Sequence, residues 1–238
     1  MSTESAIPER IVHRKSGYHH GDLRNSIIEA VAILIDERRS LDFQLKDVAR
    51  MVGTSQPAIY KHFENKQDLL IETAVAGYGY QAAFRDWAME QAGEALLAKL
   101  LGVGYAYVHF AQSCPGFYIL MKNLETDEIL SSRRYQKQRL KGISVARALV
   151  RGCVEDGTFI AVDIDDAMAS LQATVAGLAQ LYLSNSLHYV ARAKENDTEL
   201  LVRLFSLHVG SLLSAKGRRQ MAIANRNPFS TPFKLENA

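Results

Sequence analysis

The sequence predicts an all-α protein of about nine helices, in which a small N-terminal domain precedes a larger C-terminal helical domain. Apolar residues near the N-terminus recur three and four positions apart, which is the spacing of one helix face. Beyond residue 70 the pattern stays helical almost to the end, with short breaks and few clusters of strand-forming residues. With 238 residues, 47% of them hydrophobic, the chain can bury a core in both domains.

The first predicted helix begins at Leu23 and has about four turns. Residues 21–22, Gly-Asp, precede it, and residues 38–40, Arg-Arg-Ser, follow it. Its apolar positions share one face and are Leu23, Ile27, Val31 and Leu34. We expect this helix to pack across the two helices that follow.

A helix-turn-helix motif comes next in the sequence. Its first helix carries one apolar stripe, made of Leu45, Val48, Ala49 and Val52. Gly53 supplies the left-handed residue that ends such a helix, and Ser55 can cap the next one. Pro57 fits the first turn of the second helix, while Ile59 and Phe63 anchor its inner face. The outer face of the second helix is therefore free to meet DNA.

That outer face carries residue types that suit double-stranded DNA. A recognition helix presents its N-terminal residues to base edges in the major groove, and these are Thr54, Gln56 and Ala58. Glutamine can pair with adenine, and threonine or alanine methyl groups can contact the thymine methyl. We expect phosphate contacts from the neighbouring hydroxyl, ammonium and imidazole groups of Ser55, Tyr60, Lys61 and His62.

Lys66 is a candidate phosphate ligand at the start of the next helix. Asn65 and Asp68 form a capping pair, which places Lys66 in the first turn. A cation there opposes the helix dipole, and its presence makes better sense if a DNA phosphate lies at the same helix end. An ordinary solvated lysine is the alternative.

The stretch from about residue 20 to residue 72 resembles the DNA-binding domain of the TetR family of bacterial transcriptional regulators. The resemblance depends on residues in one register: Val48-Ala49, Gly53-Thr54-Ser55, Tyr60-Lys61-His62-Phe63, Lys66, Leu69 and Leu70. Gln44 departs from the family pattern, which has Ser or Thr there, so Asp42 or solvent is expected to cap the helix instead. Residues 18–23 also resemble the subgroup with a WHG-type C-terminal domain.

The chain is expected to divide into a flexible basic N-terminal arm (1–20), a helix-turn-helix DNA-binding domain (21–66), a C-terminal effector-binding and dimerisation domain (67–215) and a loosely ordered tail (216–238). In the arm, Arg14 and Lys15 are expected to touch DNA phosphates or the minor groove, with a solvated tail as the alternative.

Prolines, glycines and capping acids divide the larger domain into helices. The expected helices run from Lys66 to about Gln91, from Glu94 to about Ser113, briefly after Pro115, from about Asp127 to Glu155, through an uncharged stretch capped by Asp163 or Asp165, and from about 199 to 215 after Asp197 or Thr198. Polar residues interrupt the uncharged stretch too often for a membrane span.

A homodimer is expected, because a helix-turn-helix protein reads a pseudo-palindromic operator with two copies of its reader roughly 34 to 36 Å apart. TetR relatives dimerise through their last two long helices, and small residues and leucines on these helices favour the same interface here. An intramolecular core is the alternative. The assigned residues are Ala169, Ala173, Ala176, Gly177, Leu201, Leu204, Phe205 and His208.

A small hydrophobic or aromatic effector is expected from the aromatic residues in the helices that line the effector cavity of TetR relatives. The candidates are Phe84, Trp87, Tyr105, His109, Phe110, Phe117, Met121 and Tyr135. Plain core packing is the alternative for each of them. Effector binding would favour a dimer whose two readers are wrongly spaced, so the protein would act as a repressor that is released from DNA.

The net charge of +2 requires that DNA affinity come from a local basic face, and residues 46–66 hold four cations against two acids. Two cysteines are too few for a disulfide scaffold, and the polar N-terminus lacks a secretory signal. These features predict a cytoplasmic, nucleoid-associated protein.

The rival class is an all-helical enzyme or metal protein. His109, His188 and His208 show no metal-ligand spacing, and the glycine pairs at 77/79 and 102/104 do not complete a nucleotide-binding loop. We therefore expect no catalytic residue, no metal and no cofactor. A second alternative is a helical DNA-binding dimer without an effector, which is partner-controlled or architectural.

Overall fold

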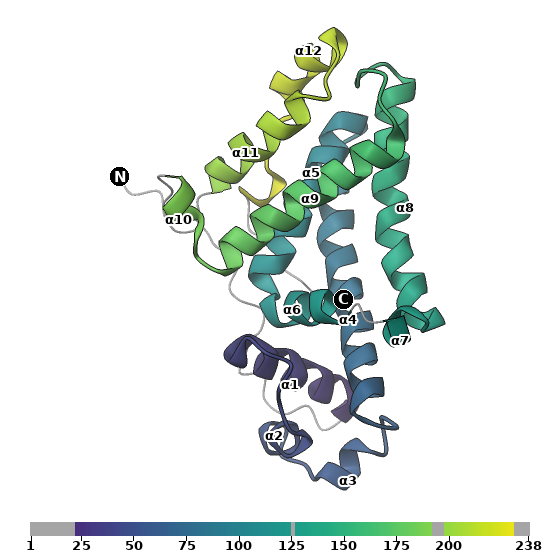
Figure 1. Cartoon of the computed structure of the whole chain (residues 1–238), viewed down its shortest axis with the longest axis vertical. Helices are drawn as coiled ribbons and strands as arrows, with labels where there is room; N and C mark the ends of the chain where they lie inside the picture. Colours follow the sequence, from purple (N-terminus) through teal and green to yellow (C-terminus); the bar gives the residue numbers. More distant parts are fainter. Residues whose placement is uncertain (1–21, 125–126, 192–197, 231–238) are drawn as a thin grey trace. The chain divides into compact units, whose positions relative to one another are not determined.

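The structure is a computed structural model that describes residues 22–124, 127–191 and 198–230 (Figure 1). Within these residues the regular elements are twelve α-helices and one 3₁₀-helix. Three of the α-helices have four residues each. Nine longer helices remain, and the all-α prediction is confirmed. No helix in this part of the chain is long and apolar enough to cross a membrane.

The elements follow one another as α1 (Leu23–Arg38), α2 (Leu45–Met51), α3 (Gln56–Ile59), α4 (Lys66–Gln91), α5 (Leu96–Ser113), α6 (Pro115–Asn123), α7 (Asp127–Leu130), α8 (Arg133–Glu155), α9 (Ile164–Leu183), α10 (Leu187–Val190), α11 (Thr198–Gly210), α12 (Ala215–Ala224) and the 3₁₀-helix η2 (Pro228–Ser230).

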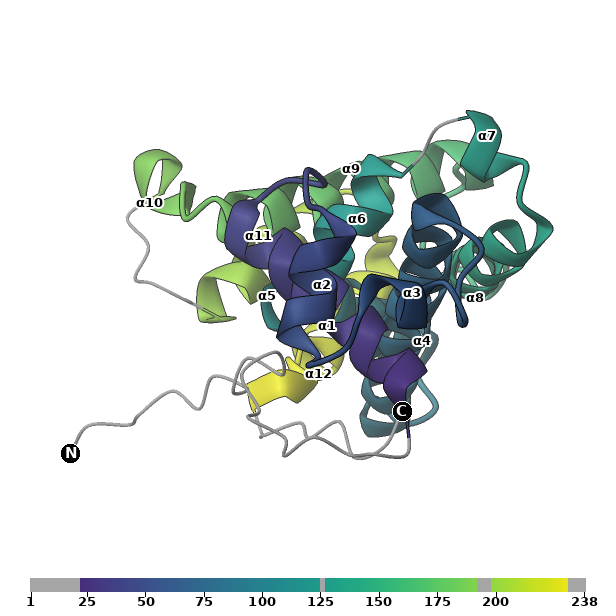
Figure 2. The same ribbon diagram turned by 90° about the horizontal axis from the view of Figure 1, so that it is seen from below.

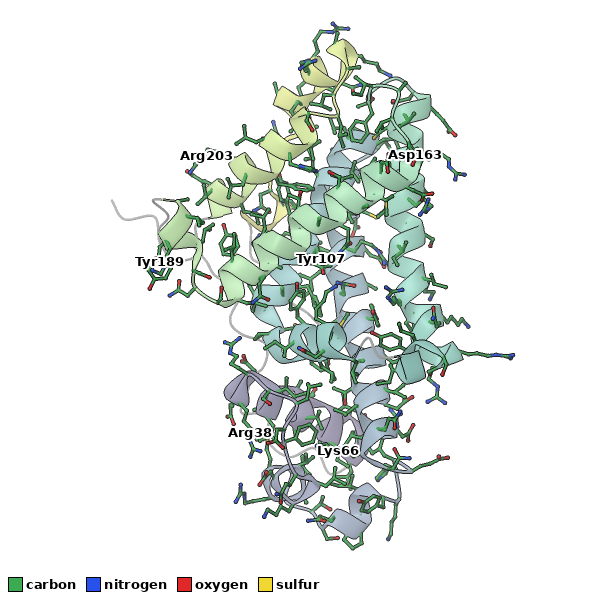
Figure 3. All side chains as sticks on the ribbon, viewed as in Figure 1. Arg38, Lys66, Tyr107, Asp163, Tyr189 and Arg203 are labelled. Atoms are coloured by element: carbon green, nitrogen blue, oxygen red, sulfur yellow. The ribbon has the colours of Figure 1, made fainter. Side chains whose placement is uncertain are left out.

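Several helix ends are set by local capping, as the sequence predicts. Asp163 caps the uncharged helix α9, because its carboxylate accepts from the backbone N–H groups of Asp165 at 2.8 Å and Asp166 at 3.1 Å. Figure 3 labels Asp163 at this helix end. The C-terminal end of α1 is set by Arg39, which adopts a left-handed conformation with φ of 52° and stops the helix.

The single helix expected from about Asp127 to Glu155 is instead two helices. Residues 131–132, Ser-Ser, separate α7 from α8. The carbonyl of Ser132 accepts from the backbone N–H of Gln136 at 3.0 Å, which makes Ser132 the first residue before α8. Serine competes with the helical backbone through local hydrogen bonds and favours such helix starts.

The prediction of a loosely ordered tail from residue 216 is wrong for α12 and η2. The Lys216 ammonium lies 3.4 Å from the Asp156 carboxylate. Gly217 lies so close to the Thr158 carbonyl oxygen that a Cβ would be 2.2 Å from it. These contacts join residues about sixty positions apart, so a local pattern could not reveal them. Residues 231–238 lie outside the described residues.

The chain forms two compact units. Among the described residues, one unit contains 22–80 and 113–139, and the other contains 81–112 and 140–230. The predicted domain boundaries after residues 20, 66 and 215 stay predictions, because compactness does not show which part binds DNA or an effector.

In the unit that contains residues 22–80, α1 packs against both α2 and α6 (Figure 2). The side chains of Ile27, Val31 and Ile35 on α1 are fully buried. Helix α6 approaches α1 so closely that a Cβ on Gly116 would lie 1.9 Å from the carbonyl oxygen of Ala32. Glycine is therefore required at position 116 for this close packing.

In the other unit, α9 contacts α11, and side chains of both helices contact α5. The Tyr105 ring on α5 meets the Phe205 ring on α11 edge to face, with ring centres 5.7 Å apart. Gln172 on α9 donates to the hydroxyl of Tyr107 on α5 at 3.3 Å (Tyr107 is labelled in Figure 3). These contacts fix the helices of this unit around a shared apolar core.

Candidate nucleic-acid interface

The helix-turn-helix motif is present with the geometry that its residues predict. Val48 and Ala49 of α2 are buried, and so are Ile59 and Phe63 after the turn. Gly53 between the helices has φ of 67°, the left-handed conformation that glycine adopts at little cost. The inner faces of both helices are thus buried in the core, and this burial fixes the orientation of the outer face.

Ser55 caps α3. Its hydroxyl oxygen accepts from the backbone N–H of Ala58 at 3.4 Å, and Pro57 lies in the first turn. Although α3 itself ends at Ile59, helical bonding continues, because the Phe63 N–H donates to the Ile59 carbonyl at 3.1 Å. Residues 56–63 therefore present one short helical surface.

The side chains predicted to meet DNA lie on that surface. Gln56, Lys61 and His62 are exposed, and 51% of the Tyr60 surface is accessible. Thr54 and Ala58 are half-buried. A glutamine amide beside two small side chains can read base edges, while the hydroxyl, ammonium and imidazole groups can donate to phosphates. Arg14 and Lys15 lie outside the described residues.

Asp47 organises the start of α2. The Arg38 guanidinium donates to its carboxylate at 2.8 Å, Arg50 contacts it at 3.3 Å, and the backbone N–H of Gln44 donates to it at 3.4 Å. The hydrogen bond from Arg38 lowers the pKa of Asp47. The cap that the sequence assigned to Asp42 or solvent is thus supplied in part by Asp47 from inside the helix.

The side chain of Lys66, which is labelled in Figure 3, contacts the helix-turn-helix motif. Its ammonium donates to the carbonyl oxygen of Phe43 at 2.6 Å and lies 4.2 Å from the centre of the Phe43 ring. The solvated lysine considered as an alternative does not describe this half-buried group. An ammonium has three N–H donors, so a phosphate contact by Lys66 stays a prediction.

A second ionic cluster, which the sequence did not reveal, joins three helices of the same unit. The buried carboxylate of Glu72 on α4 pairs with Arg24 on α1 and with Arg134 on α8. The Arg24 guanidinium also lies 5.2 Å from the centre of the Phe63 ring. Because Arg24 and Glu72 are 48 positions apart, only the tertiary fold brings them together.

Four of the eight predicted effector residues belong to one aromatic cluster, which forms around Phe229. The ring centres of Phe84, Trp87 and His109 lie 5.8, 4.9 and 4.5 Å from that of Phe229. Phe110 meets Phe84 at 6.1 Å. Burial lowers the pKa of His109 to about 4. Phe229 was not a candidate, because its segment was expected to be loosely held.

The other four predicted effector residues have different neighbours. Tyr105 packs on Phe205, and its hydroxyl donates to Asn225 at 2.7 Å. The remaining three belong to the unit with residues 22–80, where Phe117 meets the Tyr80 ring at 5.0 Å and the Tyr135 hydroxyl donates to the Met121 carbonyl at 3.3 Å. Their role in effector binding stays a prediction.

The predicted dimer residues differ in exposure within the single chain. Ala169, Ala173 and Gly177 on α9 are exposed. Three are half-buried, namely Ala176, Leu204 and His208, and two are buried, namely Leu201 and Phe205. The two buried residues serve an intramolecular core, which was the stated alternative, and their part in an interface stays a prediction.

Residues 27–73 match a family model described as bacterial regulatory proteins, tetR family. No curated protein matches the chain. Within residues 22–124, 127–191 and 198–230, no group of three or more His, Cys, Asp or Glu side chains could hold a metal ion.

Solved structures share the fold. A protein with unknown function from Rhodococcus sp. RHA1 is 22% identical, with a TM-score of 0.69 over 84% of this chain and 100% of that chain. The ketosteroid transcriptional regulator KstR2 of Mycobacterium tuberculosis is 14% identical, with a TM-score of 0.63 over 83% and 98%. The fatty acid degradation regulator FadR from Bacillus halodurans is 20% identical, with a TM-score of 0.60 over 80% and 96%. Residues 27–73 therefore resemble the TetR family of bacterial regulatory proteins, and the helical fold resembles that of the solved regulators.

Proposed function

We propose that the protein is a sequence-specific repressor that binds a pseudo-palindromic operator as a homodimer and is released by a small hydrophobic or aromatic effector. The observation that carries the DNA-binding part is the division of residues 56–63 into two faces. Ile59 and Phe63 are buried, at 1% and 2% exposure, while Gln56 and Lys61 are exposed. A helix held in this way can enter a major groove without rearrangement of its core.

Within this proposal, Gln56 reads a base, and Thr54 and Ala58 make apolar contacts beside it. Ser55, Tyr60, Lys61, His62 and Lys66 contact phosphates, together with Arg14 and Lys15 from the N-terminal arm. Phosphate contacts fix the register of the protein on the duplex but carry no sequence information. The protein would act in the cytoplasm, at the nucleoid.

The experiment compares Gln56→Ala with Lys61→Ala, two exposed positions on the same short surface. Fluorescence anisotropy measures binding to the selected operator and to a fragment of scrambled sequence. We expect Gln56→Ala to lose about 1 to 3 kcal/mol of discrimination between the two fragments. Lys61→Ala should weaken binding to both fragments equally and reduce the salt dependence. Uniform weakening by Gln56→Ala would contradict its role as a base reader.

The homodimer part of the proposal is supported by exposed small residues on α9 and by Leu207 on α11, which is 74% exposed. Exposed alanine and glycine let a partner helix approach closely, and an exposed leucine gains free energy when it is covered. Analytical ultracentrifugation tests this part. We expect a dimer for the wild type, and a bulky charged substitution, Gly177→Arg, should favour the monomer. A monomeric wild type would exclude the proposed dimer.

The effector part is supported by the aromatic cluster around Phe229, in which buried aromatic rings surround one polar imidazole. Binding there would have to favour one of two dimer states, since only differential affinity can release DNA. Release of the operator by a small molecule would distinguish this mechanism from partner-controlled or architectural binding.

A further inference from the structure

The ring of Phe229 occupies a slot between α4 and α5. Phe229 is 2% exposed and stacks on His109 at an interplanar angle of 28° and on Phe84 at 27°, while Trp87 covers it at 47°. Stacked and tilted rings at these separations are the favourable arrangements for aromatic pairs. The slot is therefore shaped for one flat aromatic ring.

A polar group accompanies the ring. The side-chain amide of Asn227 lies 3.2 Å from Nε2 of His109. His109 is 2% exposed, and burial lowers its pKa to about 4, so the imidazole is neutral near pH 7. The amide N–H of Asn227 then donates to Nε2, and the His109 proton resides on Nδ1. The same Asn227 side chain accepts from the Phe229 backbone N–H at 3.0 Å.

The segment that brings these two groups to the slot is short. It follows the end of α12 at Ala224 and ends, within the described residues, at the three-residue turn η2. Short segments outside the long helices open at a lower free-energy cost than helices in the core. The aromatic ring and the amide can therefore leave the slot while α4 and α5 stay folded.

We propose that Asn227 and Phe229 are an intramolecular occupant of the effector site, and that the effector is an uncharged aromatic compound whose hydrogen-bond donor replaces the Asn227 amide at His109. The inference rests on the proposed function for its effect on DNA, but ligand binding can be measured separately. A neutral imidazole offers no cation for a carboxylate, which favours aromatic amides or alcohols over aromatic acids. The occupant lowers the apparent affinity by competition, and so sets the concentration at which the effector acts.

The test uses the full chain and phenylacetamide, whose ring and primary amide correspond to the groups of Phe229 and Asn227. Trp87 is the one tryptophan in the sequence and lies 4.9 Å from the Phe229 ring centre, so its fluorescence reports on the slot. We expect Phe229→Ala to bind phenylacetamide at least about tenfold more tightly than the wild type, because the competitor is removed. Phenylacetate should bind more weakly than phenylacetamide.

Ile223→Ala is the matched control, since Ile223 lies on the neighbouring helix α12 and is 76% exposed. It should bind phenylacetamide as the wild type does. Equal affinity of the wild type and Phe229→Ala, or no binding to either, overturns the inference. If Phe229→Ala does not fold, Asn227→Ala replaces it: tighter binding than in the wild type supports the inference, and unchanged binding overturns it.

A parallel DNA-binding assay separates the two proposals. If the chain retards operator DNA but Phe229→Ala gains no affinity for phenylacetamide, the proposal of an intramolecular occupant is wrong and the proposed function is retained. If Phe229→Ala gains that affinity but no variant retards DNA, the proposal of an intramolecular occupant is retained and the proposed function is wrong.

Discussion

The ammonium of Lys66 donates a hydrogen bond of 2.6 Å to the carbonyl oxygen of Phe43 and lies over the Phe43 ring. This contact joins the first turn of α4 to the residue just before the cap of α2. Lys66 therefore combines a structural role in the fold with a predicted role in phosphate binding, and the two roles can be separated by experiment.

Lys66→Met should lower the free energy of unfolding by about 1 to 3 kcal/mol, because it leaves the Phe43 carbonyl without its charged donor. It should also flatten the log-log salt dependence of operator binding by roughly 0.9 per lost phosphate contact. Lys61→Met is the control, because Lys61 is exposed and should alter the salt dependence alone. An unchanged salt slope for Lys66→Met would remove Lys66 from the DNA interface.

Glu72→Gln should destabilise the unit that contains α1. The buried Glu72 carboxylate pairs with Arg24 and Arg134, and a neutral amide cannot satisfy both guanidinium groups. We expect a loss of about 1 to 3 kcal/mol in urea unfolding. Glu64→Gln, at an exposed position just before α4, should change stability little. Equal effects of the two substitutions would argue against a structural role for the cluster.

His109 should make stability depend on pH. Its pKa is about 4 in the folded chain against 6.5 ordinarily, so the unfolded chain binds more protons between these values. The free energy of unfolding should therefore fall as the pH is lowered from 6.5 to 4, by about 3 kcal/mol from this residue. Above that window His109 contributes no pH dependence.

Urea unfolding at several pH values checks this prediction. His109→Gln, which cannot take up the proton, should show a smaller dependence than the wild type, whereas the exposed control His62→Gln should retain it. If His109→Gln keeps the full wild-type slope, another group is responsible.

Gly116→Ala should disrupt the contact between α1 and α6, since a Cβ there would lie 1.9 Å from the Ala32 carbonyl oxygen. Overpacking of this kind costs about 1 to 3 kcal/mol or more. Gly79→Ala is the matched control within α4, because a Cβ at Gly79 would meet nothing within 4 Å. That substitution should stabilise the chain by about 0.5 to 1 kcal/mol, through helix propensity. Thermal unfolding of both variants gives the comparison.

The parts of the fold that could be predicted from the sequence are those that depend on residues close together in the chain. The Ser55 cap, the left-handed Gly53 and the helix bounds at Lys66 and Gln91 depend on neighbours a few residues away, and they are confirmed. The division of α2 and α3 into buried and outward-facing residues also follows from period alone. These features suffice to recognise the motif and to choose its outer residues.

What the sequence could not predict depends on contacts between distant residues. Helix α12 is held by Gly217 against Thr158, and Phe229 finds its neighbours on α4 and α5. The Phe43 contact of Lys66 is likewise set by the tertiary fold. Aromatic composition indicated the cluster but could not show that the chain itself supplies its central ring.

Operator binding by purified protein is the decisive test of whether residues 56–63 read DNA. At low ionic strength, the wild type should retard a fragment of its own upstream region in a gel, and an excess of unrelated DNA should not abolish the shift. Gln56→Ala should bind with reduced preference for that fragment. If no upstream fragment is retarded by the folded wild type, the account of the exposed face at residues 56–63 as a DNA reader is contradicted.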